Sequence, residues 1–166
     1  MGPIQKLKAS LESAGAIRSA WDRLSPLPGG PRLFDQFIAR LIPYTGSISA
    51  QVLELRTGYA RVLLRDRRAV RNHLRSIHAV ALANLAEYTG NLAFVYSLPE
   101  DARYIVRALS VHFEKKARGP IIATCESPHV ADNSSQEYDI FVEMFDESGA
   151  RVASAKFATL VGPIKN

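Results

Sequence analysis

Glu87 has the clearest capacity for chemistry, because it is the only charged residue in a long apolar segment. Between Arg75 and Glu100 lie 24 residues with this single formal charge, whereas a charged content of 22% would place about five there. Burying a carboxylate among apolar side chains costs several kcal/mol or raises its pKa, unless the group finds a partner. A carboxylate held in this way can serve as a general base or as a nucleophile.

The surroundings of Glu87 leave a structural interpretation open beside the catalytic one. An arginine could pair with Glu87 and merely hold an interface together, because structural ion pairs perturb pKa values as well. Asn84 and Asn91 lie three residues before and four residues after Glu87, on the same helical face. Their amides could donate hydrogen bonds to the carboxylate or satisfy a polar seam between subunits.

This segment predicts one long helix, from about Ile77 to Leu98. A surface helix carries a charged face, and this one carries none, so we expect it to be buried nearly all round. Near its start, at His78, Ala79 and Val80, free backbone N–H groups and the positive end of the helix dipole could stabilise a developing oxyanion.

Segments with a period of two lie on both sides of this helix and predict six strands. The first two meet at Thr57-Gly58 and are expected to form a hairpin. Because two strands, one helix and four strands do not alternate as a parallel sheet requires, we predict a consecutive antiparallel meander against the helix, an α+β fold. The expected strands are Ser47–Thr57, Tyr59–Arg65, Arg103–Glu114, Pro120–His129, Glu137–Phe145 and Arg151–Val161.

Residues 1–46 are predicted to be a helical lead-in packed on a main domain of residues 47–166. Apolar residues recur at helical spacing over residues 4–24, and Ser25–Pro31 then interrupts the helix. Leu33–Leu41 predicts a second short helix, which Pro43 ends before a turn at Thr45-Gly46.

The composition limits the class of protein but does not identify a function. A length of 166 residues suits one domain, and the net charge of +5 is compatible with an anionic ligand, nucleic acid or an ordinary surface. The single cysteine, Cys125, excludes a disulfide framework, and His112 and His129 lack ligand-spaced partners, so no metal is expected. With no signal segment and with polar residues in the apolar helix, we expect a soluble, cytoplasmic protein that does not enter the membrane.

Asn72, His78 and Glu87 follow one another at intervals of six and nine residues. This spacing resembles the central helix of the hot-dog thioesterases of the phenylacetate-pathway type, and the segment 71–87 is more similar still to an uncharacterised, DUF4442-like branch of that superfamily. The similarity extends over roughly residues 33–161. It implies a hot-dog fold, in which a curved antiparallel sheet of about six strands wraps around one long helix, and assembly as a homodimer or tetramer.

The resemblance also implies a role for each motif residue. Glu87 matches the acidic residue that attacks the thioester or activates water, and Asn72 matches the amide that positions water or substrate. Ala79 matches the glycine whose backbone N–H polarises the thioester carbonyl, and His78 matches an orienting histidine. In such dimers the helix of one subunit faces the loop of the other, so Asn72 and Glu87 come from different chains.

Two clusters of basic residues are expected to lie near this helix and to bind the phosphates of coenzyme A. Basic runs at the ends of elements are just as often solvated surface. Nucleic acid is a weaker interpretation, because Tyr59 alone is near for stacking. The predicted substrate-binding residues are Arg65, Arg67, Arg68, Arg71, Asn84, Lys115, Lys116 and Arg118.

The sequence therefore predicts hydrolysis of an acyl-CoA or acyl-carrier thioester at a subunit interface, with no cofactor beyond the coenzyme A of the substrate. The alternative is a hot-dog domain that binds an acyl thioester, or only its own partner, without turnover.

Overall fold

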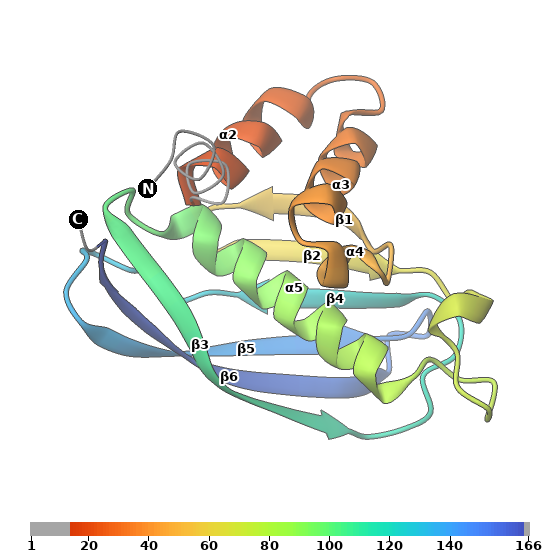
Figure 1. The fold of residues 1–166 in the computed structure, drawn as a ribbon. Helices are drawn as coiled ribbons and strands as arrows, with labels where there is room; N and C mark the ends of the chain where they lie inside the picture. The colour runs from red at the N-terminus through yellow and green to blue at the C-terminus, as the bar shows by residue number, and fades with distance from the viewer. Residues whose placement is uncertain (1–13, 165–166) are drawn as a thin grey trace.

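The structure, a computed structural model, describes residues 14–164 and contains one antiparallel sheet with a long helix across one face (Figure 1). The first 13 residues, including the start of the expected helix over residues 4–24, lie outside the described part. The strands are β1 (Gln51–Arg56), β2 (Tyr59–Leu64), β3 (Ala102–Phe113), β4 (Ile121–Glu126), β5 (Gln136–Phe145) and β6 (Arg151–Pro163).

The order of the strands in the sheet is β1-β2-β4-β5-β6-β3, so the prediction of a consecutive meander is wrong. Only the predicted β1–β2 hairpin, whose turn contains Gly58 at a φ of 72°, and the run β4-β5-β6 pair in chain order. The long helix crosses the sheet diagonally and delivers the chain to the opposite edge, where β3 pairs with β6 (Figure 1). This is the arrangement of the predicted hot-dog fold.

The long helix is α5 (Ala79–Ser97), which begins two residues later than predicted. His78 is extended and caps the helix, because its Nδ1 accepts a hydrogen bond from the backbone N–H of Val80 at 3.1 Å. At the other end Pro99 has no N–H to continue the helix. Gly90 allows α5 to approach the sheet closely: a Cβ atom at this position would lie 2.1 Å from Cζ of Phe157.

Three helices, α2 (Ala14–Leu24), α3 (Gly30–Leu41) and α4 (Pro43–Gly46), cover a second side of α5 (Figure 1). Helix α3 begins at Gly30 rather than at Leu33, because Gly29 adopts a φ of 75° and Pro31 fits the first helical turn. Trp21 and Phe34 join α2 to α3 by an edge-to-face contact, with ring centroids 5.1 Å apart. The lead-in and the sheet share one apolar core.

A third side of α5 is open, so the expectation that the helix is buried nearly all round is wrong on this side. Val80 is 53% exposed, and Ala83 and Glu87 are half-buried. These three residues follow helical spacing and form a stripe that neither the sheet nor the N-terminal helices cover. No helix within residues 14–164 is long and apolar enough to cross a lipid bilayer.

Strand β3 forms one edge of the sheet, and its free edge carries apolar side chains. Leu109 and Phe113, paired with the inward-facing Phe157 and Ala153, are 40% and 46% exposed, and Ile105 on the opposite face is 62% exposed. A long apolar edge strand with unpaired backbone groups is a template for pairing with another strand.

The close approach at Gly90 gives a direct test of the packing between α5 and the sheet. Replacing glycine by alanine inside a helix normally stabilises it by about 1 kcal/mol, but here the added methyl group must displace Phe157. We expect Gly90→Ala to lower the free energy of unfolding by about 2 kcal/mol in a denaturant titration. Gly162→Ala, where nothing lies within 4 Å of the new Cβ, is the control and should change it by less than about 0.5 kcal/mol.

Candidate active site

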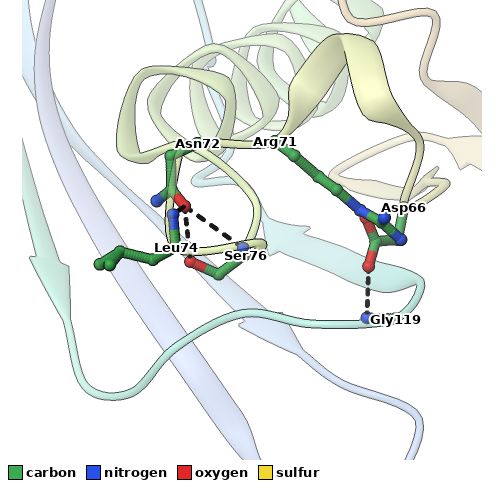
Figure 2. A network of polar contacts seen from close by, with 6 residues as sticks. All are labelled: Asp66, Arg71, Asn72, Leu74, Ser76 and Gly119. Carbon is green, nitrogen blue, oxygen red and sulfur yellow. Dashed lines mark hydrogen bonds and ion pairs between the residues drawn. The ribbon is translucent and has the colours of Figure 1, made fainter.

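Asn72 builds the loop that leads into α5. Its Oδ1 accepts hydrogen bonds from the backbone N–H groups of Leu74 and Ser76, at 2.9 and 3.2 Å, and from the Ser76 hydroxyl at 3.1 Å (Figure 2). The backbone N–H of Asn72 also donates to the carbonyl of Ser76 at 2.8 Å. Because Oδ1 is fully engaged inside the loop, the side chain is held in one orientation. Its Nδ2 has no acceptor within residues 14–164 and is left as a donor.

The backbone N–H of Ala79 is the second free donor of the site. It opens α5, where no carbonyl of the helix can accept from it, and no other acceptor reaches it within the described residues. Its position is fixed from both sides of the loop, because the N–H of His78 donates to Val70 at 2.8 Å and that of Ile77 to Ala117 at 2.8 Å. A fixed N–H at the positive end of a helix can stabilise an oxyanion.

His78 is the N-cap residue of α5. Since Nδ1 accepts from Val80, the ring nitrogen that faces the helix carries no proton, and a neutral imidazole then carries its proton on Nε2. The side chain of His78 thereby caps α5 directly before the free N–H group of Ala79.

Asp66 holds the loop against a second segment of the chain. One carboxylate oxygen accepts from Nε of Arg71 at 2.6 Å and the other from the backbone N–H of Gly119 at 2.9 Å (Figure 2). The side chain of Asp66 is only 10% exposed, and the hydrogen bond from Arg71 holds the pKa of its carboxyl group below the usual range. Asp66 thus clamps the start of the motif loop onto residues 117–119. Sequence reasoning missed it, although it is the only acidic residue in the basic run 65–71.

A cavity of about 240 Å³ lies at the start of α5, between the motif loop and the segment around α4. It brings together three of the predicted site residues, Arg71, His78 and Asn84. The full lining is Tyr44, Ser47, Ile48, Ala69, Val70, Arg71, His78, Val80, Ala81 and Asn84.

Glu87 has no hydrogen bond and no ion pair within residues 14–164, so the alternative of a pairing with an arginine is not formed within the described chain. The flanking amides do not serve it either. Asn84 donates through Nδ2 to the carbonyl of Tyr44 at 3.0 Å, and Oδ1 of Asn91 is buried without a donor. Burial, and to a smaller extent the negative charge of Glu87, raises the pKa of Tyr104 on β3 to about 12.

Glu87 and the two free donors are not brought together within one chain. Eight residues of helix separate Ala79 from Glu87, a distance of about 12 Å along the axis. Reacting atoms must approach to roughly 3–3.5 Å. The carboxylate of one chain and the N–H of the same chain therefore cannot act on one thioester.

The predicted phosphate-binding cations divide into two groups. Arg71 pairs with Asp66, and Lys115 pairs with Asp146 at 2.6 Å, while the other engaged cations donate to uncharged oxygens, Arg65 to Gln51 and Arg67 to the carbonyl of Ser47. Arg68, Lys116 and Arg118 are exposed and have no hydrogen bond or ion pair within residues 14–164.

The structure describes no metal-binding cluster: within residues 14–164, no three His, Cys, Asp or Glu side chains gather closely enough to hold an ion. Cys125 is buried in β4, and burial raises the pKa of its thiol to about 12, so it is an apolar core residue.

Two substitutions of Asn72 separate its acceptor from its donor. Asn72→Ala leaves three donors of the loop without their acceptor and should lower the free energy of unfolding by about 1–2 kcal/mol. Asn72→Asp keeps the acceptor oxygen and removes only the Nδ2 donor. It should therefore lower the free energy of unfolding by less than half as much as Asn72→Ala. Thermal unfolding measures both, and equal losses in the two variants would contradict the role given to Oδ1.

The comparisons with known proteins agree with this fold. The family described as "Domain of unknown function (DUF4442)" matches residues 30–161. A structural-genomics target, APC5556, is 28% identical, with a TM-score of 0.79 over 89% of this chain and 99% of that one. A Pseudomonas aeruginosa protein of unknown function, called a "Probable Thioesterase", is 22% identical, with a TM-score of 0.72 over 83% of this chain and 97% of that one.

More distant structures share the same fold. A thioesterase from Haemophilus influenzae is 11% identical, with a TM-score of 0.67 over 79% of this chain and 92% of that one. No match to a curated protein was found. Since the family match covers well over half of the sequence, the chain belongs to the DUF4442 family, and its strands and helices have the order of the hot-dog fold.

Proposed function

We propose that the chain hydrolyses acyl thioesters of coenzyme A or of an acyl carrier, at sites shared between two copies of the chain. One observation carries the proposal: a free carboxylate and a free helix N-terminal N–H face solvent on the same helix, about 12 Å apart. A second α5 running antiparallel to the first brings the Glu87 of one chain beside the Ala79 of the other.

The free edge of β3 supplies the means of assembly. Two copies related by a two-fold axis can pair their β3 strands, which extends the sheet and covers the exposed Leu109 and Phe113. In this arrangement the open stripe of Val80, Ala83 and Glu87 would face the second chain. A tetramer of two such dimers would keep the same shared sites.

The proposed reaction is attack of water on the thioester carbonyl carbon. Glu87 of one chain takes the proton of the water, or attacks the carbon itself to give an anhydride that water then cleaves. The carbonyl oxygen becomes an oxyanion, which the Ala79 N–H of the other chain stabilises at the helix N-terminus. The C–S bond breaks, the thiolate takes up the proton, and the products are a carboxylic acid and a free thiol. Asn72 would place its Nδ2 donor toward the water or the substrate.

Arg68, Lys116 and Arg118 suit the phosphates of coenzyme A. They have no partner within residues 14–164, and Asp66 ties the two segments that carry them to each other. Arg71 and Lys115 are neutralised by Asp66 and Asp146 and are less available. The names of relatives with this fold support thioester chemistry, since two of those described above are called thioesterases.

The shared site predicts that two inactive variants restore activity in each other. Glu87→Gln removes the base and should lower kcat at least a hundredfold, without loss of stability because Glu87 has no ion pair to lose. Ala79→Pro removes the N–H at the first helical position, where proline is tolerated and where His78 is already extended. It should lower kcat by roughly a hundredfold or more.

Mixing the two variants after unfolding and refolding them together should restore about a quarter of the parental rate, because half of the dimers are mixed and each holds one intact site. A thiol-release assay with acyl-CoA measures the rate, and light scattering measures the mass. If Glu87 and Ala79 of the same chain formed the site, the mixture would stay inactive. A monomeric protein in solution would also overturn the proposal.

The three unpaired cations give a second prediction. Replacing Arg68, Lys116 and Arg118 together by alanine should raise KM for acyl-CoA at least tenfold and change kcat little, because charge-assisted contacts to phosphate contribute about 1.5–3 kcal/mol each. An acyl thioester of N-acetylcysteamine, which has no phosphate, should be hydrolysed equally by the variant and the parent. Arg61→Ala, an exposed cation on β2, is the control. An unchanged KM would assign the three cations to the solvated surface.

A further inference from the structure

A small, mostly apolar cavity lies under the N-terminal helices, beside the proposed nucleophile. It has a volume of about 50 Å³ and is enclosed by α2, α3, α4, α5 and the start of β3. Its apolar wall comes from Ile17, Ile38, Ile42, Leu92 and Val95. Thr45, Tyr88, Asn91 and Tyr104 supply the polar atoms of the lining.

Three of these polar residues carry atoms with no hydrogen-bond partner within residues 14–164. Oδ1 of Asn91 is buried without a donor. Tyr88 is 7% exposed, and neither its hydroxyl nor that of Tyr104 takes part in a hydrogen bond. A buried polar group without a partner costs about 1–3 kcal/mol, so native proteins contain few of them. Among these atoms only Oδ1 of Asn91 is fully buried, and the hydroxyls of Tyr88 and Tyr104 lie at the same cavity. A ligand that enters the cavity can supply the partner that Asn91 lacks and also reach these hydroxyls.

The cavity adjoins both the proposed site and a larger space. Asn91 lies one helical turn after Glu87 on α5, and the negative charge of Glu87 contributes to the raised pKa of the Tyr104 hydroxyl. On the far side, Ile38, Thr45 and Tyr88 also line a second cavity of about 290 Å³ between α3, α4 and β1. A group attached to a thioester at Glu87 can therefore enter the small cavity and meet Tyr88 at the wall shared with the larger one.

We propose that this cavity takes the acyl group of the thioester and that Tyr88 and Asn91 select acyl groups that carry a hydroxyl. The inference rests on the proposed thioesterase function and adds the substrate class. A hydroxyl is the group that satisfies both residues at once, because it can donate to Oδ1 of Asn91 and accept from the hydroxyl of Tyr88. Burial raises the pKa of Tyr88 far above its usual value, so its hydroxyl stays a donor at neutral pH. A plain alkyl group would fill the space and leave these atoms without partners.

A titration that needs no turnover tests the proposal. The probes are thioether analogues of acyl-CoA, which cannot be hydrolysed: S-hexyl-CoA and a series in which one carbon of the hexyl chain, from the third to the last, bears a hydroxyl. An extended six-carbon chain spans roughly one helical turn, the separation of Glu87 and Asn91. We expect at least one hydroxylated probe to bind the parent protein about tenfold more tightly than S-hexyl-CoA, as two hydrogen bonds would give.

The preference for the hydroxylated probe should disappear in Tyr88→Phe and in Asn91→Leu. Both variants should unfold near the parental temperature, because neither substitution removes a hydrogen bond within residues 14–164. Tyr138→Phe is the matched control. This tyrosine contacts Phe94 of α5 but does not line the cavity, so the preference for the hydroxylated probe should remain.

Equal binding of plain and hydroxylated probes to the parent overturns the proposal, as does a preference that survives both substitutions or the absence of binding by any probe. Failure of the thioesterase function looks different. The protein would then release no thiol from any acyl-CoA, while the hydroxylated thioether still binds more tightly and depends on Tyr88 and Asn91.

Discussion

The burial of one uncharged helix is the constraint on which the rest of this structure depends. Helix α5 is apolar on almost every side, and a single twisted sheet can cover only one of them. The N-terminal helices cover a second side, where Asn84 of α5 donates a hydrogen bond to the carbonyl of Tyr44 in α4. The third side, with Val80 and Glu87, stays open in the single chain, next to a strand edge that is also uncovered. The open side of α5 and the free edge of β3 are thus two apolar surfaces that the single chain leaves uncovered and that a second copy would cover.

The same helix explains why the candidate chemistry depends on backbone atoms. A helix without charged residues in its first turn offers little besides its own free N–H groups and its dipole at that end. These N–H groups can stabilise an oxyanion only if their positions are fixed. The loop before the helix fixes them through few side chains. Asn72 closes the loop and Asp66 fastens it to Gly119 (Figure 2). His78 caps the first turn. Three side chains, those of Asn72, Asp66 and His78, therefore fix the position of a single backbone N–H group.

Local patterns were sufficient for the elements of the fold, and they failed where the answer depended on distant partners. The period of two located all six strands, and the uncharged segment located α5 to within two residues of its start. The order of the strands was wrong, because nothing local states to which edge a diagonal helix delivers the next strand. The same limit applied to the cations: Arg71 and Lys115 differ from Arg68 and Lys116 only through the carboxylates of Asp66 and Asp146. For Lys115 that carboxylate lies 31 residues farther along the chain.

Glu87 connects assembly to chemistry. In the single chain this carboxylate is half-buried and has no partner, so water can still solvate it. If two chains pair along β3, the same contact that covers the apolar stripe also removes much of this water. Electrostatic interactions strengthen as the local dielectric constant falls, so the carboxylate and the facing N–H group of the other chain would act on a bound thioester far more strongly than either does in water. A sequence that needed Glu87 only as an ion-pair partner would be expected to place a cation within its reach, and the described part of the chain places none there. The absence of an internal partner for Glu87 within the described residues and the exposure of the strand edge are both what the proposed site, completed only between chains, requires.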